Sequence, residues 1–234
     1  MNAIFKREFK SYFATPIGYI FLAVLYLFLG LIFWVNFMMG SPDLTVIFSF
    51  MSSIVVLLLP LLTMRLMSED KRQKVDQALL TAPVKLTSIV LGKFLAALAV
   101  FAIGFAPTII FQIIVSAYVT VNVLPFIYSF FGIILLGGAL IAMGMFISSL
   151  TESTAISAIL TLGVNFTAVY LPSFASYLVS SESIKSAINS LSFLNAFESF
   201  SENLFSVSDI IYFLSFIAVF LFLCVRSLEK RRWS

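Results

Sequence analysis

Long apolar stretches separated by short charged clusters dominate this chain. No charged side chain occurs in residues 11–42, 44–64, 94–151, 153–181 or 210–225. A helix needs about 20 apolar residues to cross a membrane, so 94–151 is too long for one helix. Asn122 and Pro125 favour a turn inside it. The pattern predicts six spanning helices, with the fifth ending near Pro172, over approximately 17–36, 45–66, 89–118, 126–150, 154–173 and 209–226.

The composition identifies the solvent of these helices. Hydrophobic residues make up 61% of the 234 residues and charged residues 11%, against roughly 45–50% and about 25% in globular proteins. One soluble core cannot hide that much apolar surface, and a disordered chain would need low hydrophobicity and high charge. We therefore predict an all-α integral membrane protein.

The positions of the basic residues predict the orientation. Six spans place both termini on one side of the membrane, and this side then holds 13 of the 14 Lys and Arg residues. Only Lys185 lies on the other side. Basic residues collect on the cytoplasmic side of membrane proteins, so we place both termini in the cytoplasm, with 229–234 as a basic tail. The net charge of +3 then reflects topology, and we expect no nucleic-acid partner.

The residue types that are missing limit the chemistry. The chain has no histidine, and Cys224 is its single cysteine. It therefore offers no internal disulfide, no His/Cys ligand set for a metal and no histidine-based catalysis. A P-loop needs G-x-x-x-x-G-K-[ST], and Gly92-Lys93 lacks the preceding glycine. We predict no catalytic residue, no metal site and no ATP site in this chain.

Residues 1–14 precede the first span, and 2–14 have the pattern of an amphipathic helix. Aromatic residues fall on one arc and polar or basic residues on the opposite arc (Phe5, Phe9, Tyr12 and Phe13 against Lys6, Arg7, Lys10 and Ser11). Such a helix lies in the membrane interface, with its basic face towards anionic headgroups. It either only anchors the first span or also touches a cytoplasmic partner.

The cytoplasmic loop 67–88 has the strongest local helix signals outside the spans. Ser68 can cap a helix, and Glu69 and Asp70 suit a helix N-terminus. Val75, Ala78 and Leu79 follow at helical spacing, and Pro83 ends the pattern. Either this helix docks on a partner's groove, or the loop is solvated and its charges only enforce topology.

The outer segment 174–208 is longer than a simple connection. Its parts 182–191 and 193–205 can form two short helices, and the second would turn an apolar face towards the membrane. Glu198 and Glu202 lie four residues apart on the other face of the second helix. They either bind a cation or act as acid and base, or simply form a solvated polar face.

Polar residues inside the predicted spans are few. Gln112 lies deep in the third span and Asn165 in the middle of the fifth. Each either marks a pathway or bonds a neighbouring helix. No charged residue falls near the centre of a span, which argues against an ion-coupled carrier.

The order of these parts resembles the membrane subunit of type-2 ABC transporters, and is most similar to the gliding-motility-associated permease subfamily. The resemblance is carried by KREFKSYFATPIGYIF (6–21), SEDKRQKVDQALLTAPV (68–84), IVLGKF (89–94) and IIYFLSFIAVFLFLCVRSLEKRRW (210–233). It covers nearly the whole chain.

The resemblance implies a permease domain over 15–228 in a bacterial plasma membrane, with 1–14 as an elbow helix and 174–208 as an outer gating hairpin holding Glu198 and Glu202. It implies that 69–82 is a coupling helix that docks on a separate P-loop ATPase. The contact residues would be Arg72, Gln73, Val75, Asp76, Leu79 and Leu80.

The same resemblance implies the partners. Two ATP-binding subunits would bind ATP and Mg²⁺, and a second permease chain, identical or paralogous, would complete the pathway. An extracytoplasmic auxiliary subunit is a further expected partner, besides membrane lipid. The expected function is therefore export or force transmission driven by ATP hydrolysis in the partner. The alternative is an ATPase-independent membrane scaffold or a channel-like protein.

Overall fold

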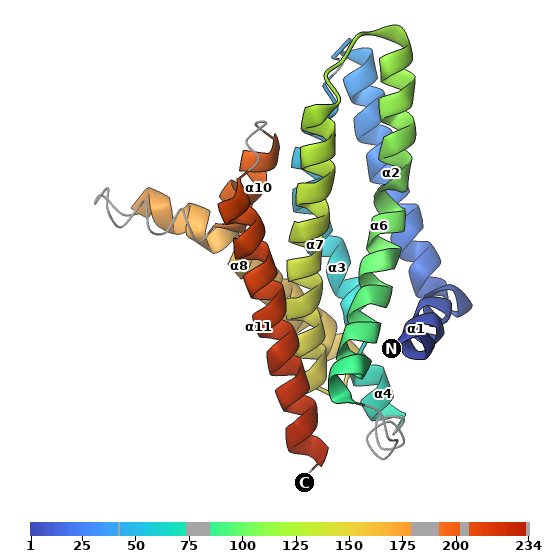
Figure 1. The fold of residues 1–234 in the computed structure, drawn as a ribbon, viewed down its shortest axis with the longest axis vertical. Helices are drawn as coiled ribbons and strands as arrows, with labels where there is room; N and C mark the ends of the chain where they lie inside the picture. The colour runs from blue at the N-terminus through green and yellow to red at the C-terminus, as the bar shows by residue number, and fades with distance from the viewer. Residues whose placement is uncertain (42, 74–84, 179–191, 202–205, 233–234) are drawn as a thin grey trace.

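The computed structural model describes the chain except for residues 42, 74–84, 179–191, 202–205 and 233–234, and the described part is helical with no β-strand. The helices are shown in Figure 1. They are α1 (Asn2–Ala14), α2 (Pro16–Met38), α3 (Thr45–Thr63), α4 (Ser68–Arg72), α6 (Leu86–Tyr118), α7 (Leu124–Leu150), α8 (Thr154–Leu178), α10 (Phe193–Ser201) and α11 (Val207–Arg232).

Six helices among the described residues are long and apolar enough to cross a membrane. They are α2, α3 with α4, α6, α7, α8 and α11, which confirms the predicted all-α membrane fold with six spans. The predicted end of the fifth span is wrong, because Pro172 lies inside α8 and the helix continues to Leu178. Proline is better tolerated within a helix in lipid, because neighbouring groups can satisfy the carbonyl that it leaves free. Unwinding the helix there would leave further backbone groups without a hydrogen-bond partner, since no water is present.

Helix α7 forms the centre of the bundle and contacts α3, α6, α8, α10 and α11. Its sequence is apolar on all sides, as expected for a helix with no solvent-facing stripe. Glycines allow close approach: a Cβ on Gly137 would lie 2.2 Å from the Phe101 ring of α6. A Cβ on Gly144 would lie 2.5 Å from Thr63 Oγ1 of α3 and 2.8 Å from Thr161 Cγ2 of α8.

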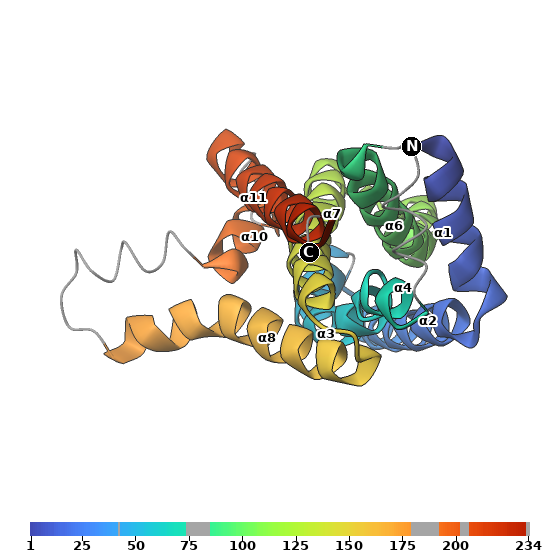
Figure 2. The same ribbon diagram turned by 90° about the horizontal axis from the view of Figure 1, so that it is seen from below.

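Helices α2, α8 and α11 surround this centre and turn apolar side chains outward. Leu31, Ile159 and Phe222 are examples, each more than half exposed. Such a surface is suited to lipid rather than water. Figures 1 and 2 show that the later part of α8 leaves the bundle, while its first part packs on α3 and α7.

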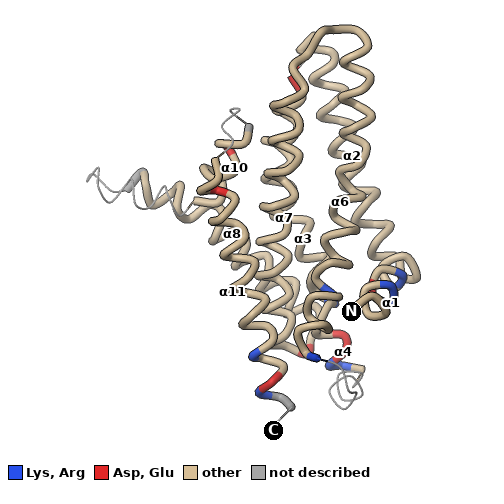
Figure 3. The backbone as a smooth tube through the Cα atoms, viewed as in Figure 1, with Lys and Arg blue, Asp and Glu red and all other residues tan. Residues whose placement is uncertain are grey.

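Most charged residues of the described part of the chain gather at one end of the bundle, shown at the bottom of Figure 3. This end holds α1, α4, the start of α6 and the end of α11. We call it the charged end. Figure 3 shows only isolated acidic residues at the opposite end and along the spans.

Candidate functional site

A buried lysine joins three helices at the charged end. Lys93 of α6 is 1% exposed. Its Nζ lies 2.8 Å from Asp70 Oδ2 of α4 and 3.1 Å from Glu8 Oε1 of α1. It also donates a hydrogen bond of 2.7 Å to the carbonyl of Leu66. We call Lys93, Glu8 and Asp70 the ion triad.

Arg7 adds a second positive charge beside the ion triad. Its guanidinium pairs with Glu8 and lies 3.9 Å from Asp70 Oδ2. Two cations therefore face two carboxylates, and the group as a whole is neutral. The Lys93 and Glu8 side chains are 1% and 12% exposed, so water screens their attraction less than on an open surface. Removing one member would leave the others buried and unbalanced.

A second ion pair lies beside the triad and holds the corner between α1 and α2. Thr15 is extended because Pro16 follows it, which ends α1 and starts α2 with proline at the first turn. Arg65 donates to the Glu69 carboxylate through Nε and Nη2, the latter at 2.7 Å from Oε1. The same Arg65 donates a hydrogen bond of 2.9 Å to Thr15 Oγ1. The corner is thereby tied to α3 and α4.

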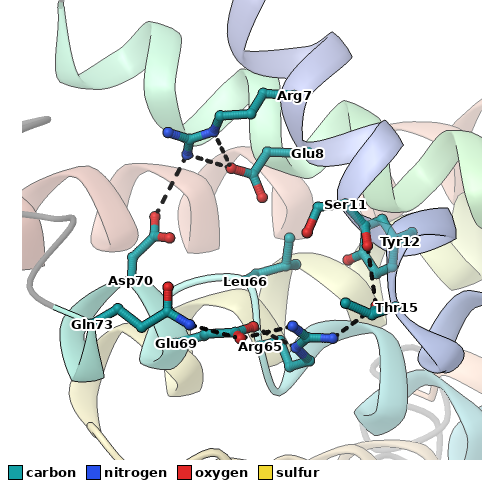
Figure 4. Close-up of a pocket in the computed structure, with 10 residues that line it drawn as sticks. All are labelled: Arg7, Glu8, Ser11, Tyr12, Thr15, Arg65, Leu66, Glu69, Asp70 and Gln73. Carbon is teal, nitrogen blue, oxygen red and sulfur yellow. Dashed lines mark hydrogen bonds and ion pairs between the residues drawn. The ribbon is translucent and has the colours of Figure 1, made fainter.

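An open cleft of about 340 Å³ lies between these groups. Figure 4 shows α1 side chains on one side and Arg65 with the α4 side chains on the other. Its polar lining consists of Arg7, Glu8, Ser11, Tyr12, Thr15, Arg65, Glu69, Asp70 and Gln73.

The buried phenol of Tyr12, which lines this cleft, anchors α1 to α3. Its hydroxyl donates a hydrogen bond of 2.8 Å to the carbonyl of Leu62. Burial raises the pKa of Tyr12 well above its usual range, and the negative charge of Glu8 acts in the same direction against Arg65. The phenol therefore keeps its proton and remains a donor at any physiological pH.

Helix α4 is also fixed to the end of α7. Ser148 Oγ accepts hydrogen bonds from the backbone N–H groups of Met67 (3.1 Å) and Ser68 (3.0 Å), and donates one to the carbonyl of Met64. Lys71 donates to the carbonyl of Ser149. One serine thus satisfies two backbone donors of the turn that leads from α3 into α4.

These contacts make α4 a junction between several helices at the charged end. Through Asp70 it reaches α1 and α6, through Arg65–Glu69 the α1–α2 corner, and through Ser148 and Ser149 it reaches α7. The described residues contain no group of His, Cys, Asp and Glu that could hold a metal ion. What the arrangement can do is pass a displacement of α4 to the spanning helices.

The structure describes two of the six predicted docking residues, and both lie at the C-terminal end of α4. Arg72 and Gln73 are exposed, and Gln73 donates a hydrogen bond of 3.1 Å to Glu69. The other four, Val75, Asp76, Leu79 and Leu80, lie outside the described residues. The predicted Ser68 cap is wrong: Met67 occupies the cap position, and Ser68 Oγ instead donates back to the Met64 carbonyl.

The two predicted pathway residues are both buried. Gln112 is 6% exposed and donates a hydrogen bond of 3.2 Å to Ser116 on its own helix. Asn165 is fully buried, and neither atom of its amide has a hydrogen-bond partner among the described residues. Thr161 and Ser157, four and eight residues earlier on the same face of α8, also have buried hydroxyls without a partner there. This face of α8 lies on the α3 and α7 side of the bundle.

We predict that Asn165→Leu raises the thermal stability of the purified chain. A buried polar group without a partner costs about 1–3 kcal/mol, and leucine fills a similar volume without that cost. The unfolding temperature in detergent measures the effect. Thr167→Val on the exposed face of the same helix, where Thr167 bonds only the Gly163 carbonyl, should change it little. A drop in stability for Asn165→Leu would mean that the amide is satisfied in the folded protein.

The predicted outer carboxylate pair is described in part. Glu198 is exposed on α10, whereas Glu202 lies outside the described residues. The expectation that the apolar face of this helix turns to the membrane is wrong. Phe193 and Phe200 are buried against Phe213 of α11, and a Cβ on Gly132 of α7 would lie 3.0 Å from Phe200. The missing side chain of Gly132 makes room for α10 inside the bundle.

Sequence reasoning missed the residues that build the junction. In the sequence, Lys93 adds only to the basic residues that predict topology and Asp70 only suits a helix N-terminus, while Glu8 and Ser148 give no signal. The clue for Lys93 was its position: the apolar run Ile89–Leu91 precedes it and Phe94 follows, so a helix places its charge within the buried part of a span.

A comparison with known protein families gives a match over most of the chain. A family model described as "ABC-2 type transporter" matches residues 1–207. The matched range contains α1, the ion triad, α4 and five of the six spans. No curated protein matches the chain closely enough to count as a relative.

Proposed function

The chain belongs to the ABC-2 type transporter family and is a multi-pass permease subunit of an ABC transporter, and we propose that a separate P-loop ATPase drives it by docking on 69–82. The observation that carries the proposal is the junction at α4. A short helix that pairs with α1 through Arg7–Asp70 and with α6 through Lys93–Asp70, and that is bonded to α7, is suited to receive a push and distribute it. The sequence has no P-loop of its own, so the energy would come from a partner that binds ATP and Mg²⁺.

The charged end faces the cytoplasm in this proposal. Clustered Lys and Arg at one end of the bundle support that orientation, and a bacterial plasma membrane is the proposed location. Two permease chains, identical or paralogous, and two ATPase subunits would form the complex. The gliding-motility subfamily, the auxiliary subunit and export as the direction rest on the sequence resemblance alone.

Movement would follow from the contacts of the junction. ATP binding would close the ATPase pair and press on 69–82. Asp70 would carry the displacement to Lys93 of α6 and to Arg7 of α1, and Ser148 would carry it to α7. Tilting of α3 and α6 against the rest of the bundle would then open the pathway on the opposite side, or transmit force without moving a solute.

We predict that Leu79→Asp abolishes assembly with the ATPase subunit. Leu79 is proposed to enter an apolar groove, and a buried unpaired carboxylate there costs several kcal/mol. The measurement is the amount of ATPase that co-purifies with the tagged permease. Lys10→Asp, on the exposed side of α1, serves as the matched control. If the Leu79→Asp chain still assembled fully with the ATPase subunit, Leu79 would not belong to the docking surface.

A scaffold or channel-like protein without an ATPase is the alternative, and no observation at the junction favours it. In that case the chain would purify without a P-loop protein.

A further inference from the structure

An apolar groove of about 570 Å³ runs between α6 and α11 at the charged end. Its size falls in the range of small-molecule pockets, roughly 300–1,000 Å³. Val90 and Leu91 line it from α6, and Ile217, Ala218 and Leu221 line it from α11. The groove is separate from the α4 junction, with which it shares no lining residue.

The polar side chains of the groove are confined to its charged end. Thr87 lies in the first turn of α6, and Arg226 and Glu229 lie in the last turns of α11. The remaining lining is aliphatic or aromatic. The groove thus has a polar mouth and an apolar length, which matches an amphiphile rather than a water-soluble ligand.

The charge at the mouth selects an anion. The Arg226 side chain is 62% exposed, lies over the Phe222 ring at 5.0 Å and pairs through Nη1 with Glu229 at 2.6 Å. A guanidinium has five N–H donors, so this pairing leaves several directed outward. Exposed Lys230 follows one turn later on α11, and exposed Lys85 starts α6. Among the residues that line the groove, Arg226 is the group that can receive an anion at the mouth.

The neighbouring surface places the mouth at the depth of lipid headgroups. Leu91, Leu214 and Phe222 border the groove and are 39%, 51% and 56% exposed, as expected for side chains in contact with acyl chains. Arg226 follows directly after this apolar part of α11, where arginine typically reaches to the interface.

We propose that this groove binds one anionic phospholipid, with its phosphate at Arg226 and an acyl chain along Val90, Ile217 and Leu221. Bound lipid would fill the space between α6 and α11 and would hold the two helices together at the charged end. The proposal needs only a membrane-embedded chain and is independent of the ATPase partner.

The test is native mass spectrometry of the purified full chain in mild detergent. The probe is an equimolar mixture of phosphatidylglycerol, phosphatidylethanolamine and phosphatidylcholine with identical acyl chains. The wild-type chain should retain one phosphatidylglycerol in preference to the other two. Arg226→Ala should lower this retention about tenfold, and Arg226→Lys should keep most of it.

Two bulky substitutions test the groove itself. Ala218→Trp fills it without changing a charge and should expel the lipid, whereas Ala23→Trp, at an exposed alanine of α2 outside the groove, should not. Leu214→Trp replaces Ala218→Trp if the latter does not fold, as judged by circular dichroism. Arg72→Ala controls for the loss of one charge at the same end.

Three results would overturn the proposal. The first is equal retention of the three lipids by the wild-type chain. The second is unchanged retention in Arg226→Ala. The third is unchanged retention in the folded groove variant, which would leave only a headgroup contact and no groove site. Because no ATPase is present, each result is distinguishable from a failure of the proposed function.

Discussion

Replacing Lys93 by methionine is expected to destabilise the chain by about 3–5 kcal/mol, because breaking a buried ion pair leaves its partner charge uncompensated. Methionine keeps the length and apolar stem of lysine but removes the charge between Glu8 and Asp70, and leaves the Leu66 carbonyl without this donor. In the assembled transporter, α4 would also lose its direct link to α6. ATP hydrolysis should then continue while transport or force output falls. Thermal unfolding in detergent and coupled activity are the two measurements.

A double-mutant cycle makes this prediction specific to the ion triad. Asp70→Asn removes one of the carboxylates that Lys93 balances, so Lys93→Met combined with Asp70→Asn should cost clearly less than the sum of the two single changes. Lys10→Met, which removes an exposed lysine from α1, is the matched control and should shift stability by less than about 0.5 kcal/mol. Additive costs would mean that Lys93 and Asp70 do not interact.

Ser148→Ala is expected to have the second largest effect. It removes the acceptor for the backbone N–H groups of Met67 and Ser68 at a buried position. Each orphaned donor costs about 1–3 kcal/mol. The turn between α3 and α4 should loosen from α7, and hydrogen exchange at Met67 and Ser68 should accelerate before the spans themselves exchange.

Ser215→Ala provides the comparison for this change. Ser215 is exposed on α11 and donates only to the Tyr212 carbonyl of its own helix. Its loss should leave exchange around α4 unchanged. If Ser148→Ala behaves like Ser215→Ala, the contact with α7 does not fix α4, and the junction reduces to the ion triad.

The spanning helices could be predicted from the sequence because their signal is local. A run such as 44–64 is long enough to cross a membrane and has no charge, so its length and composition alone predict a spanning helix. The error at Pro172 has the same origin. The rule that proline ends helices is calibrated on water-exposed segments, whereas in α8 the helix continues past it.

The junction could not be predicted because its contacts join distant positions. Glu8, Asp70 and Lys93 come from three helices, and nothing in the residues around Glu8 indicates which lysine faces it. Ser148 illustrates the same limit, since a serine near a helix end most often bonds its own backbone. Here Ser148 Oγ instead accepts hydrogen bonds from backbone N–H groups where the turn enters α4. By contrast, the match to the ABC-2 type transporter family confirms the permease family that the resemblance implied, and leaves its gliding-motility subfamily as a prediction.

The most direct test of the account is to purify the tagged full chain from its native membrane in mild detergent, identify co-purifying proteins by mass spectrometry and assay ATP hydrolysis. The account predicts a stoichiometric P-loop ATPase in the wild-type sample, with turnover that persists in the Lys93→Met complex while coupled output is lost. A chain that purifies alone and without ATP turnover after gentle extraction would contradict it.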